Sequence, residues 1–391
     1  MPWKETRAMD ERGRLVYLVQ EGESVAEAAR QCGVSRKTAH KWLARHAELG
    51  LSGLTDRSSA ALTHPNALTD EVAERVIELR AAHPTWGPRK LMHWLREHES
   101  KCIWPVASTI GRLLKERGLT IPRSRRRPLK PYTQPLEHCT GPNRVWCADF
   151  KGWFHTGDGK RCDPLTISDG YSRYLLQTRG LAHPTFIAVR PLFEATLREY
   201  GLPEAIRTDN GVPFASTTGL GLSRLAVWWI DLGITPERIM PGCPEQNGRH
   251  ERMHRTLKLE TLKPPAHTLR QQQFRFDTFR NQYNNERPHE ALEYRTPADV
   301  YRISPRSYPS RLKRHEYRSA WKVCRVYRKG CFYHAGTNYF LTDVLGEREI
   351  ALAPTENEEI HLIYYGHVCI GLLNQRKKRI GAPPRNATPL E

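Results

Sequence analysis

The sequence lacks any long hydrophobic run. Its apolar stretches, such as residues 15–19 (Leu-Val-Tyr-Leu-Val), are far shorter than the about 20 residues that a membrane-spanning helix needs. The N-terminal residues MPWKETRAMDERG also lack the apolar region of a secretory signal. We therefore expect neither a membrane protein nor a secreted one.

Paired cysteines are absent as well. The nine cysteines are an odd number, and no two are spaced as Cys-x-x-Cys. This pattern argues against a disulfide framework. His138 and Cys139 adjoin, but no second pair of ligands stands at a spacing suited to zinc. The cysteines therefore indicate a reducing compartment and no structural zinc.

Acidic residues are few relative to basic ones. Lys and Arg number 61 against 42 Asp and Glu, a net charge of +19. Such an excess repels itself unless an anionic partner neutralises it, and DNA is the common partner. A generic basic protein or a membrane-surface protein is the alternative. With 39% hydrophobic residues, the 391-residue chain can build two to four folded domains.

Residues 1–55 have the pattern of a helix-turn-helix DNA-binding domain. Ser24 and Glu27 form a capping-box pair, Gly33 marks a tight turn, and Ser35 starts the helix RKTAHKWLARH. The apolar residues of that last helix form one stripe, and its outward-facing residues are predicted to contact DNA: Arg36, Lys37, His40 and Lys41. The alternative is a small helical bundle with a solvated basic face.

Residues 66–120 predict a second helix-turn-helix-like domain. Pro88 suits the first turn of one helix and Gly118 ends the last, which carries the predicted DNA contact Arg112. Residues 121–140 form a basic, proline-rich linker that is either a solvated spacer or a phosphate-tracking segment. Its predicted DNA contacts are Arg125, Arg126 and Arg127.

The pattern then changes twice. Residues 141–303 alternate between strands and helices, which predicts an α/β domain with a mixed sheet. Residues 315–374 are rich in Val, Tyr, Phe and Ile with regularly spaced turns, which predicts a small all-β barrel. Residues 375–391 are predicted to form a basic tail.

Three carboxylates stand out in this basic chain. Asp149 lies in the first strand of the α/β domain, Asp209 at the end of a later strand, and Glu251 in the first turn of a helix. Hard oxygen ligands of this kind suit Mg²⁺ or Mn²⁺, and two such ions can promote in-line attack on a phosphodiester. Singly each residue has an ordinary structural explanation, such as the Asp-Asn-Gly turn at 209–211.

The order of the motifs resembles a known family. Residues 141–301 are similar to the ribonuclease-H-like catalytic core of retroviral-integrase-like DDE transposases. The motifs are W-x-A-D at 146–149, D-x-Y-S-R at 169–173, T-D-N-G at 208–211, N-G-R-H-E-R-M-H-R-T-L-K at 247–258 and N-E-R-P-H-x-A-L at 285–292. With its helical front and predicted β barrel, nearly the whole chain resembles bacterial insertion-sequence transposases.

The resemblance implies metal-dependent DNA cleavage and strand transfer, with Asp149, Asp209 and Glu251 as catalytic residues and ligands of two Mg²⁺ or Mn²⁺ ions. The third carboxylate has a rival. Glu245 follows Asp209 after 35 residues, the spacing usual in the family, whereas Glu251 follows after 41. We choose Glu251 because it begins a helix after Asn-Gly, while Glu245 sits in a loop.

The helix of Glu251 carries further predicted DNA contacts: His254, Arg255 and Lys258. The sequence thus predicts a transposase that binds the terminal inverted repeats of an element, assembles as a homo-oligomer on double-stranded DNA, and works in the bacterial cytoplasm at the nucleoid. The β domain would aid DNA binding or assembly. The alternatives are a DNA-binding regulator with an inactive core and a nuclease that hydrolyses without joining.

Overall fold

The computed structural model describes residues 8–56, 68–120, 139–216, 220–239 and 248–383. The predicted contacts Arg125, Arg126 and Arg127 and the rival carboxylate Glu245 lie outside these ranges. The chain divides into two compact units, Met1–Leu68 and Thr69–Glu391. No helix within the described ranges combines the length and the apolar character that crossing a membrane requires.

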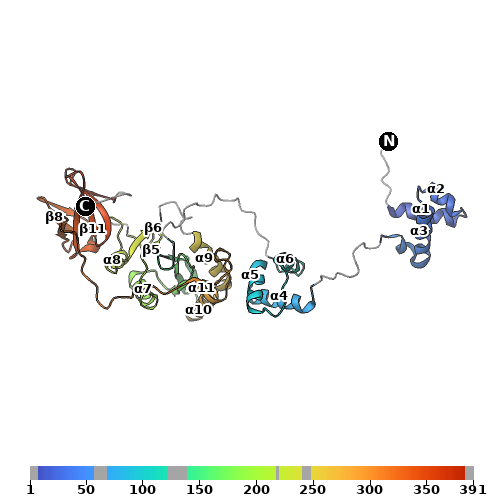
Figure 1. Ribbon diagram of the computed structural model, residues 1–391, viewed down its shortest axis with the longest axis horizontal. Coiled ribbons are helices and arrows are strands. Elements are labelled where there is room, and N and C mark those ends of the chain that lie inside the picture. Colours follow the sequence, from blue (N-terminus) through green and yellow to red (C-terminus); the bar gives the residue numbers. More distant parts are fainter. Residues whose placement is uncertain (1–7, 57–67, 121–138, 217–219, 240–247, 384–391) are drawn as a thin grey trace. The chain divides into compact units, whose positions relative to one another are not determined.

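The first unit is a bundle of helices α1 (Ala8–Gln20), α2 (Val25–Gln31) and α3 (Arg36–Leu49), followed by the short 3-10 helix η1 (Gly50–Leu54) (Figure 1). Ser24 and Ser35 cap α2 and α3, each accepting a hydrogen bond from the third backbone N–H of its helix. Gly33, with φ 66°, makes the turn between them. Ala39 and Trp42 of α3 are buried against α1 and α2, so the opposite face of α3 points to solvent.

The second unit begins with three helices, α4 (Asp70–Ala82), α5 (Pro88–His98) and α6 (Ala107–Glu116). Pro88 opens α5, as its fixed φ and missing N–H favour. These helices share an apolar core of their own, formed by Val76, Leu79, Trp86, Leu91, Leu95, Trp104, Ile110 and Leu114. The helical character predicted for both N-terminal segments is therefore confirmed.

A six-stranded mixed sheet follows, built from β1 (Val145–Phe150), β2 (Phe154–His155), β3 (Arg161–Asp169), β4 (Leu175–Leu181), β5 (Ala205–Thr208) and β6 (Thr235–Arg238). Its order is β2-β3-β1-β5-β6, with β4 paired to β3. The pairs β1–β3 and β3–β4 are antiparallel, whereas β1–β5 and β5–β6 are parallel. The predicted mixed sheet is thus confirmed.

Helices cover both faces of this sheet. On one face, α7 (Phe186–Tyr200) and α8 (Arg224–Asp231) bury an aromatic core that includes Phe193 and Trp229. On the other face, α9 (Gly248–Thr261) and α10 (Leu269–Asn285) pack through Met253, Leu257 and Phe276. The short elements η3 (Glu290–Leu292) and α11 (Pro297–Val300) complete this domain.

The C-terminal region is antiparallel β structure. Strands β7 (Lys322–Arg325), β10 (Glu349–Pro354), β11 (Ile360–Tyr365), β12 (Val368–Asn374) and β13 (Arg379–Gly381) form a five-stranded sheet, and β8 (Cys331–His334) pairs with β9 (Thr337–Phe340). A 3-10 turn, η4 (Asp343–Leu345), precedes β10. The predicted barrel closure is not confirmed, because in the described part of the chain no ladder joins the edge strands β7 and β13.

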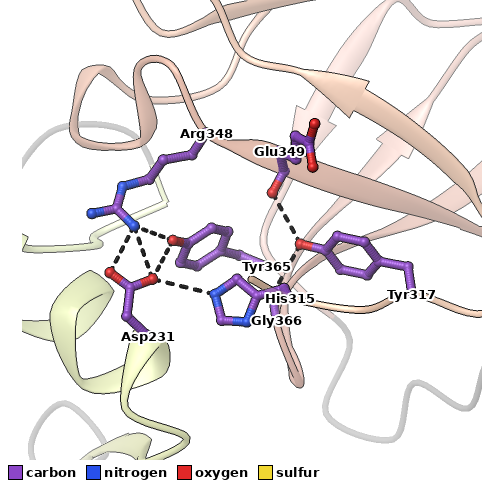
Figure 2. A network of polar contacts seen from close by, with 7 residues as sticks. All are labelled: Asp231, His315, Tyr317, Arg348, Glu349, Tyr365 and Gly366. Carbon is purple, nitrogen blue, oxygen red and sulfur yellow. Dashed lines mark hydrogen bonds and ion pairs between the residues drawn. The ribbon is translucent and has the colours of Figure 1, made fainter. Parts of the chain in front are cut away.

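Helix α8 links the mixed-sheet domain to this β region. Its residues Ala226, Val227 and Ile230 belong to the apolar core of the β strands. At its last residue, the Asp231 carboxylate accepts hydrogen bonds from Arg348 at 2.7 and 2.8 Å, and Tyr365 also donates to it (Figure 2). The same helix therefore packs on the mixed sheet and anchors the β region.

Candidate active site

Asp149 lies near the end of β1 with its side chain toward α9. Side chains alternate along a strand, so Trp146 and Ala148 enter the core under α7 and α8 while Asp149 faces the opposite layer. Its carboxylate is largely buried, with an exposed side-chain fraction of 17%. Burial, followed by repulsion from Asp209 and Glu251, raises the pKa of Asp149 to about 7.

Asp209 follows β5, the parallel neighbour of β1. Ala148 and Thr208 are register partners in the β1–β5 ladder, so Asp149 and Asp209 come next on adjacent strand ends. The Asp209 carboxylate accepts a hydrogen bond from Gly211 N at 3.2 Å, which is an Asx turn. The Asn210 amide donates to Ile239 O at 3.0 Å and ties this turn to the chain beyond β6. The Asp-Asn-Gly turn thus holds Asp209 at the sheet edge.

Glu251 lies in the first turn of α9, where its side chain is exposed. Met253 and Leu257 on the opposite side of this helix are buried in the core against α10. The negative charge of Glu251 helps to raise the pKa of Asp149, so Glu251 lies within electrostatic range of Asp149. Arg255 and Lys258, also exposed, follow Glu251 at the four- and seven-residue spacings of one helix face.

The three carboxylates have the oxygen donor atoms that a divalent ion needs. Oxygen donors of this type are the ligands of Mg²⁺ and Mn²⁺, and an ion would neutralise the repulsion that raises the pKa of Asp149. In the described ranges, no three His, Cys, Asp or Glu side chains stand close enough together to enclose an ion as they are.

Two buried histidines, His250 and His254, form a polar cluster behind Asp149. Both are at most 5% exposed, and their Nε2 atoms lie 2.7 and 2.6 Å from the Thr166 hydroxyl. Burial lowers the pKa of His250 to about 3 and that of His254 well below its ordinary value, so both rings are neutral. The DNA contact predicted for His254 does not fit this position, because a ring enclosed by β1, β3 and α9 offers no surface to a phosphate.

Sequence reasoning missed His250, although a signal for it was present. His250, His254, Leu257 and Thr261 follow one another at spacings of four, three and four, and all are buried. A stripe with that period is the buried side of a helix, whatever the polarity of its members.

The remaining predicted DNA contacts are surface residues. Arg36, Lys37, His40 and Lys41 are exposed on α3, as is Arg112 on α6, where Glu116 lies 3.8 Å away. Asp169, which the sequence assigns to a strand turn, accepts hydrogen bonds from Asn143 N and from the backbone and hydroxyl of Ser172. These bonds occupy its carboxylate in holding the turn between β3 and β4.

Comparison with protein families matches three segments of the chain. Residues 232–297, which include α9 and Glu251, match the integrase core domain. Residues 6–55 and residues 38–114 each match a homeodomain-like domain.

Similar proteins come from bacterial insertion elements. The uncharacterized 31.7 kDa protein of insertion element IS407 from Burkholderia multivorans is 29% identical over 253 residues, which is 64% of this chain and 87% of that protein. Transposase InsD of insertion element IS2 from Escherichia coli is 25% identical over 306 residues, 73% of this chain and 93% of InsD.

Among solved structures, the HTLV-2 integrase catalytic core domain in complex with magnesium is 16% identical, and the match covers 42% of this chain and 99% of that domain. The TM-score of this match is 0.34. The matched integrase core domain and homeodomain-like domains, with similar proteins among the insertion-element transposases, identify an enzyme that cuts and joins DNA and that is similar to those transposases.

Proposed function

We propose that this chain is a DNA transposase that binds the terminal inverted repeats of its element, cleaves the phosphodiesters at the element ends, and transfers the 3′-hydroxyl strand into target DNA. Asp149, Asp209 and Glu251 are its catalytic carboxylates and hold two Mg²⁺ or Mn²⁺ ions. The strand transfer exchanges one phosphodiester for another, so the reaction needs no nucleotide cofactor.

The observation that carries this proposal is the approach of three carboxylates from separate elements in a basic protein. Two of them follow paired positions on parallel strands, and the third lies in the first turn of α9, within electrostatic range of Asp149. Burial first, and then repulsion from Asp209 and Glu251, raises the pKa of Asp149 to about 7. A buried carboxylate with a raised pKa costs folding free energy, and such groups occur preferentially at functional sites.

When bound, two divalent ions activate the attacking oxygen and stabilise the leaving oxygen of the phosphodiester. The protein's own residues have two tasks. The β1 and β5 ends hold Asp149 and Asp209 at fixed positions on a rigid sheet edge. On α9, the exposed Arg255 and Lys258 extend from the carboxylate site and are placed to bind the DNA backbone by its phosphates.

The helical segments supply the recognition of DNA. The exposed residues of α3 suit a helix that enters the major groove, with Arg36 and Lys37 at its N-terminal end. Arg112 on α6 gives the second helical segment an exposed basic residue as well. Recognition by two helical segments suits a long site such as an inverted repeat. Because both ends of an element must be held together, we propose that the chain acts as a homo-oligomer on DNA.

The test uses the full chain with Mg²⁺ and labelled DNA that carries the flanking end of the element. A matched duplex with a scrambled end is the control. Transposition predicts a nick at the element boundary and a joined product of greater length, both specific to the authentic end. Cleavage without any joined product would favour a hydrolytic nuclease, and specific binding without cleavage would favour a regulator with an inactive core.

A further inference from the structure

A buried polar cluster connects the strand of Asp149 to the helix of Glu251. Its members are Thr166 and Ser168 on β3 and His250 and His254 on α9. The Thr166 hydroxyl lies 2.6 Å from His254 Nε2 and 2.7 Å from His250 Nε2, and the Ser168 hydroxyl lies 3.0 Å from His250 Nδ1. Four polar side chains, each at most 8% exposed, therefore satisfy one another inside the protein.

The cluster reaches both halves of the candidate active site. Thr166 is the register partner of Asp149 in the β1–β3 ladder, and its hydroxyl lies 3.1 Å from the Asp149 carbonyl oxygen. His250 immediately precedes Glu251 in α9. The other ring nitrogen of His254, Nδ1, lies 3.8 Å from Asp149 Oδ2. A single hydroxyl thus ties α9 to the strand pair that carries Asp149.

The count of protons decides how His254 faces Asp149. Thr166 has one hydroxyl proton, and each neutral imidazole has one N–H. If Thr166 donated to the Asp149 carbonyl or to His250 Nε2, His254 Nε2 would carry the one proton of its ring, and the bare Nδ1 of His254 would face a carboxylate oxygen. If Thr166 donates to His254 Nε2 instead, His254 Nδ1 carries the proton and faces Asp149 Oδ2. The second arrangement is favoured when Asp149 is ionised, as it must be to hold a metal ion, because it puts an N–H, and not a second lone pair, against the carboxylate.

We propose that His254 is a positioning residue that orients the Asp149 carboxylate through its Nδ1–H, while the contacts of both histidines with Thr166 set the spacing between α9 and β3, the strand paired with β1. The inference rests on the proposed function of Asp149 as a metal ligand. Partners of this kind, one step removed from the ion, orient the ligands, and their loss typically changes metal affinity by about 10–100-fold.

Two amide substitutions separate the two ring nitrogens. In His254→Asn the amide nitrogen occupies the place of Nδ1, so a donor toward Asp149 is kept and the contact with Thr166 is lost. In His254→Gln the amide reaches the place of Nε2, so the contact with Thr166 is kept and the donor toward Asp149 is lost. Thr166→Val removes the shared hydroxyl at nearly constant shape, and Thr256→Val, on the same helix outside the cluster, is its control.

The measurement is the affinity of the full-length protein for Mn²⁺, followed by the electron paramagnetic resonance signal of the free ion, with thermal unfolding of each variant beside it. We expect His254→Gln to weaken Mn²⁺ binding by about 10-fold or more and His254→Asn by only a few-fold. Thr166→Val should weaken binding as well, whereas Thr256→Val should not.

Equal Mn²⁺ affinities in the wild type, His254→Asn and His254→Gln would overturn the proposal, and so would an equal loss in both variants, because packing alone would then explain the histidine. Wild-type protein that binds no Mn²⁺, or binds it as well after Asp149→Asn, would instead contradict the metal site itself. The two failures are therefore distinguishable in one set of titrations.

Discussion

Replacement of Asp149 by Asn should stabilise the metal-free protein while it abolishes catalysis. In the folded protein the pKa of Asp149 is raised from 3.8 to about 7, by burial first and then by Asp209 and Glu251. Below about pH 4 the Asp149 carboxyl is protonated in both the folded and the unfolded chain, so it does not lower the free energy of unfolding. As pH rises toward 7 the unfolded chain ionises first, and stability is lost. The amide of the Asp149→Asn variant does not ionise, so the variant gains stability at neutral and higher pH.

The pKa displacement sets the size of the gain. Going from 3.8 to about 7 corresponds to about 4 kcal/mol at most. Because Asp149 is partly accessible to solvent, with 17% of its side chain exposed, we expect about 2–3 kcal/mol. For a domain of this size that is a rise of several degrees in Tm.

The assay is thermal unfolding in EDTA at about pH 5.5 and about pH 8, where the gain should be smaller and larger respectively. Mg²⁺ should then raise the Tm of the wild type and leave that of Asp149→Asn nearly unchanged. Asp277→Asn, at an exposed position on α10, is the control. A variant no more stable than wild type at about pH 8, or an equal response of both proteins to Mg²⁺, would refute the reasoning.

Three further outcomes follow from the structure. Arg348→Met should destabilise the junction of α8 with the β region by about 1–2 kcal/mol, which is less than for a fully buried ion pair because Arg348 is partly exposed. Urea unfolding will measure this loss, and the control variant Arg328→Met, at an exposed position, should show none. Burial opposes ionisation of Asp231, but the hydrogen bonds to its carboxylate and the Arg348 charge outweigh burial and lower the pKa of Asp231. The stability that Asp231 contributes is therefore present above about pH 4 and lost on acidification, and thermal melts over a series of pH values will measure that loss. Ser35→Ala should cost about 1 kcal/mol by removing the cap of α3 and should weaken binding to an element end in a gel-shift assay, whereas a fully stable variant would show that the cap is dispensable.

Local patterns in the sequence predict most of the elements. The serine caps at Ser24 and Ser35 and the glycine turn at Gly33 lie where the helices of the first unit begin and end. The Asp-Asn-Gly turn after β5 and the helix that follows Asn247-Gly248 are equally local signals. Each depends on residues a few positions apart, so one stretch of chain is enough to specify it.

Features that depend on distant residues could not be predicted in this way. The closure of a barrel requires the first and last strands to pair, and no pattern within β7 or β13 decides that. The anchoring of Asp231 by Arg348 and Tyr365 joins positions more than 100 residues apart. His254 is a polar residue of a type that is common on protein surfaces, and it is buried only because α9 packs against β1 and β3.

If Asp149, Asp209 and Glu251 form one catalytic site, loss of the Glu251 carboxylate must abolish the chemistry. The measurement is cleavage and joining of a labelled element end with Mg²⁺ by wild type, Glu251→Gln and Glu245→Gln, with DNA binding measured for each. We expect Glu251→Gln to bind the end but neither cut nor join it, while Glu245→Gln binds, cuts and joins it. Loss of both activities in Glu245→Gln, with Glu251→Gln active, would contradict the assignment.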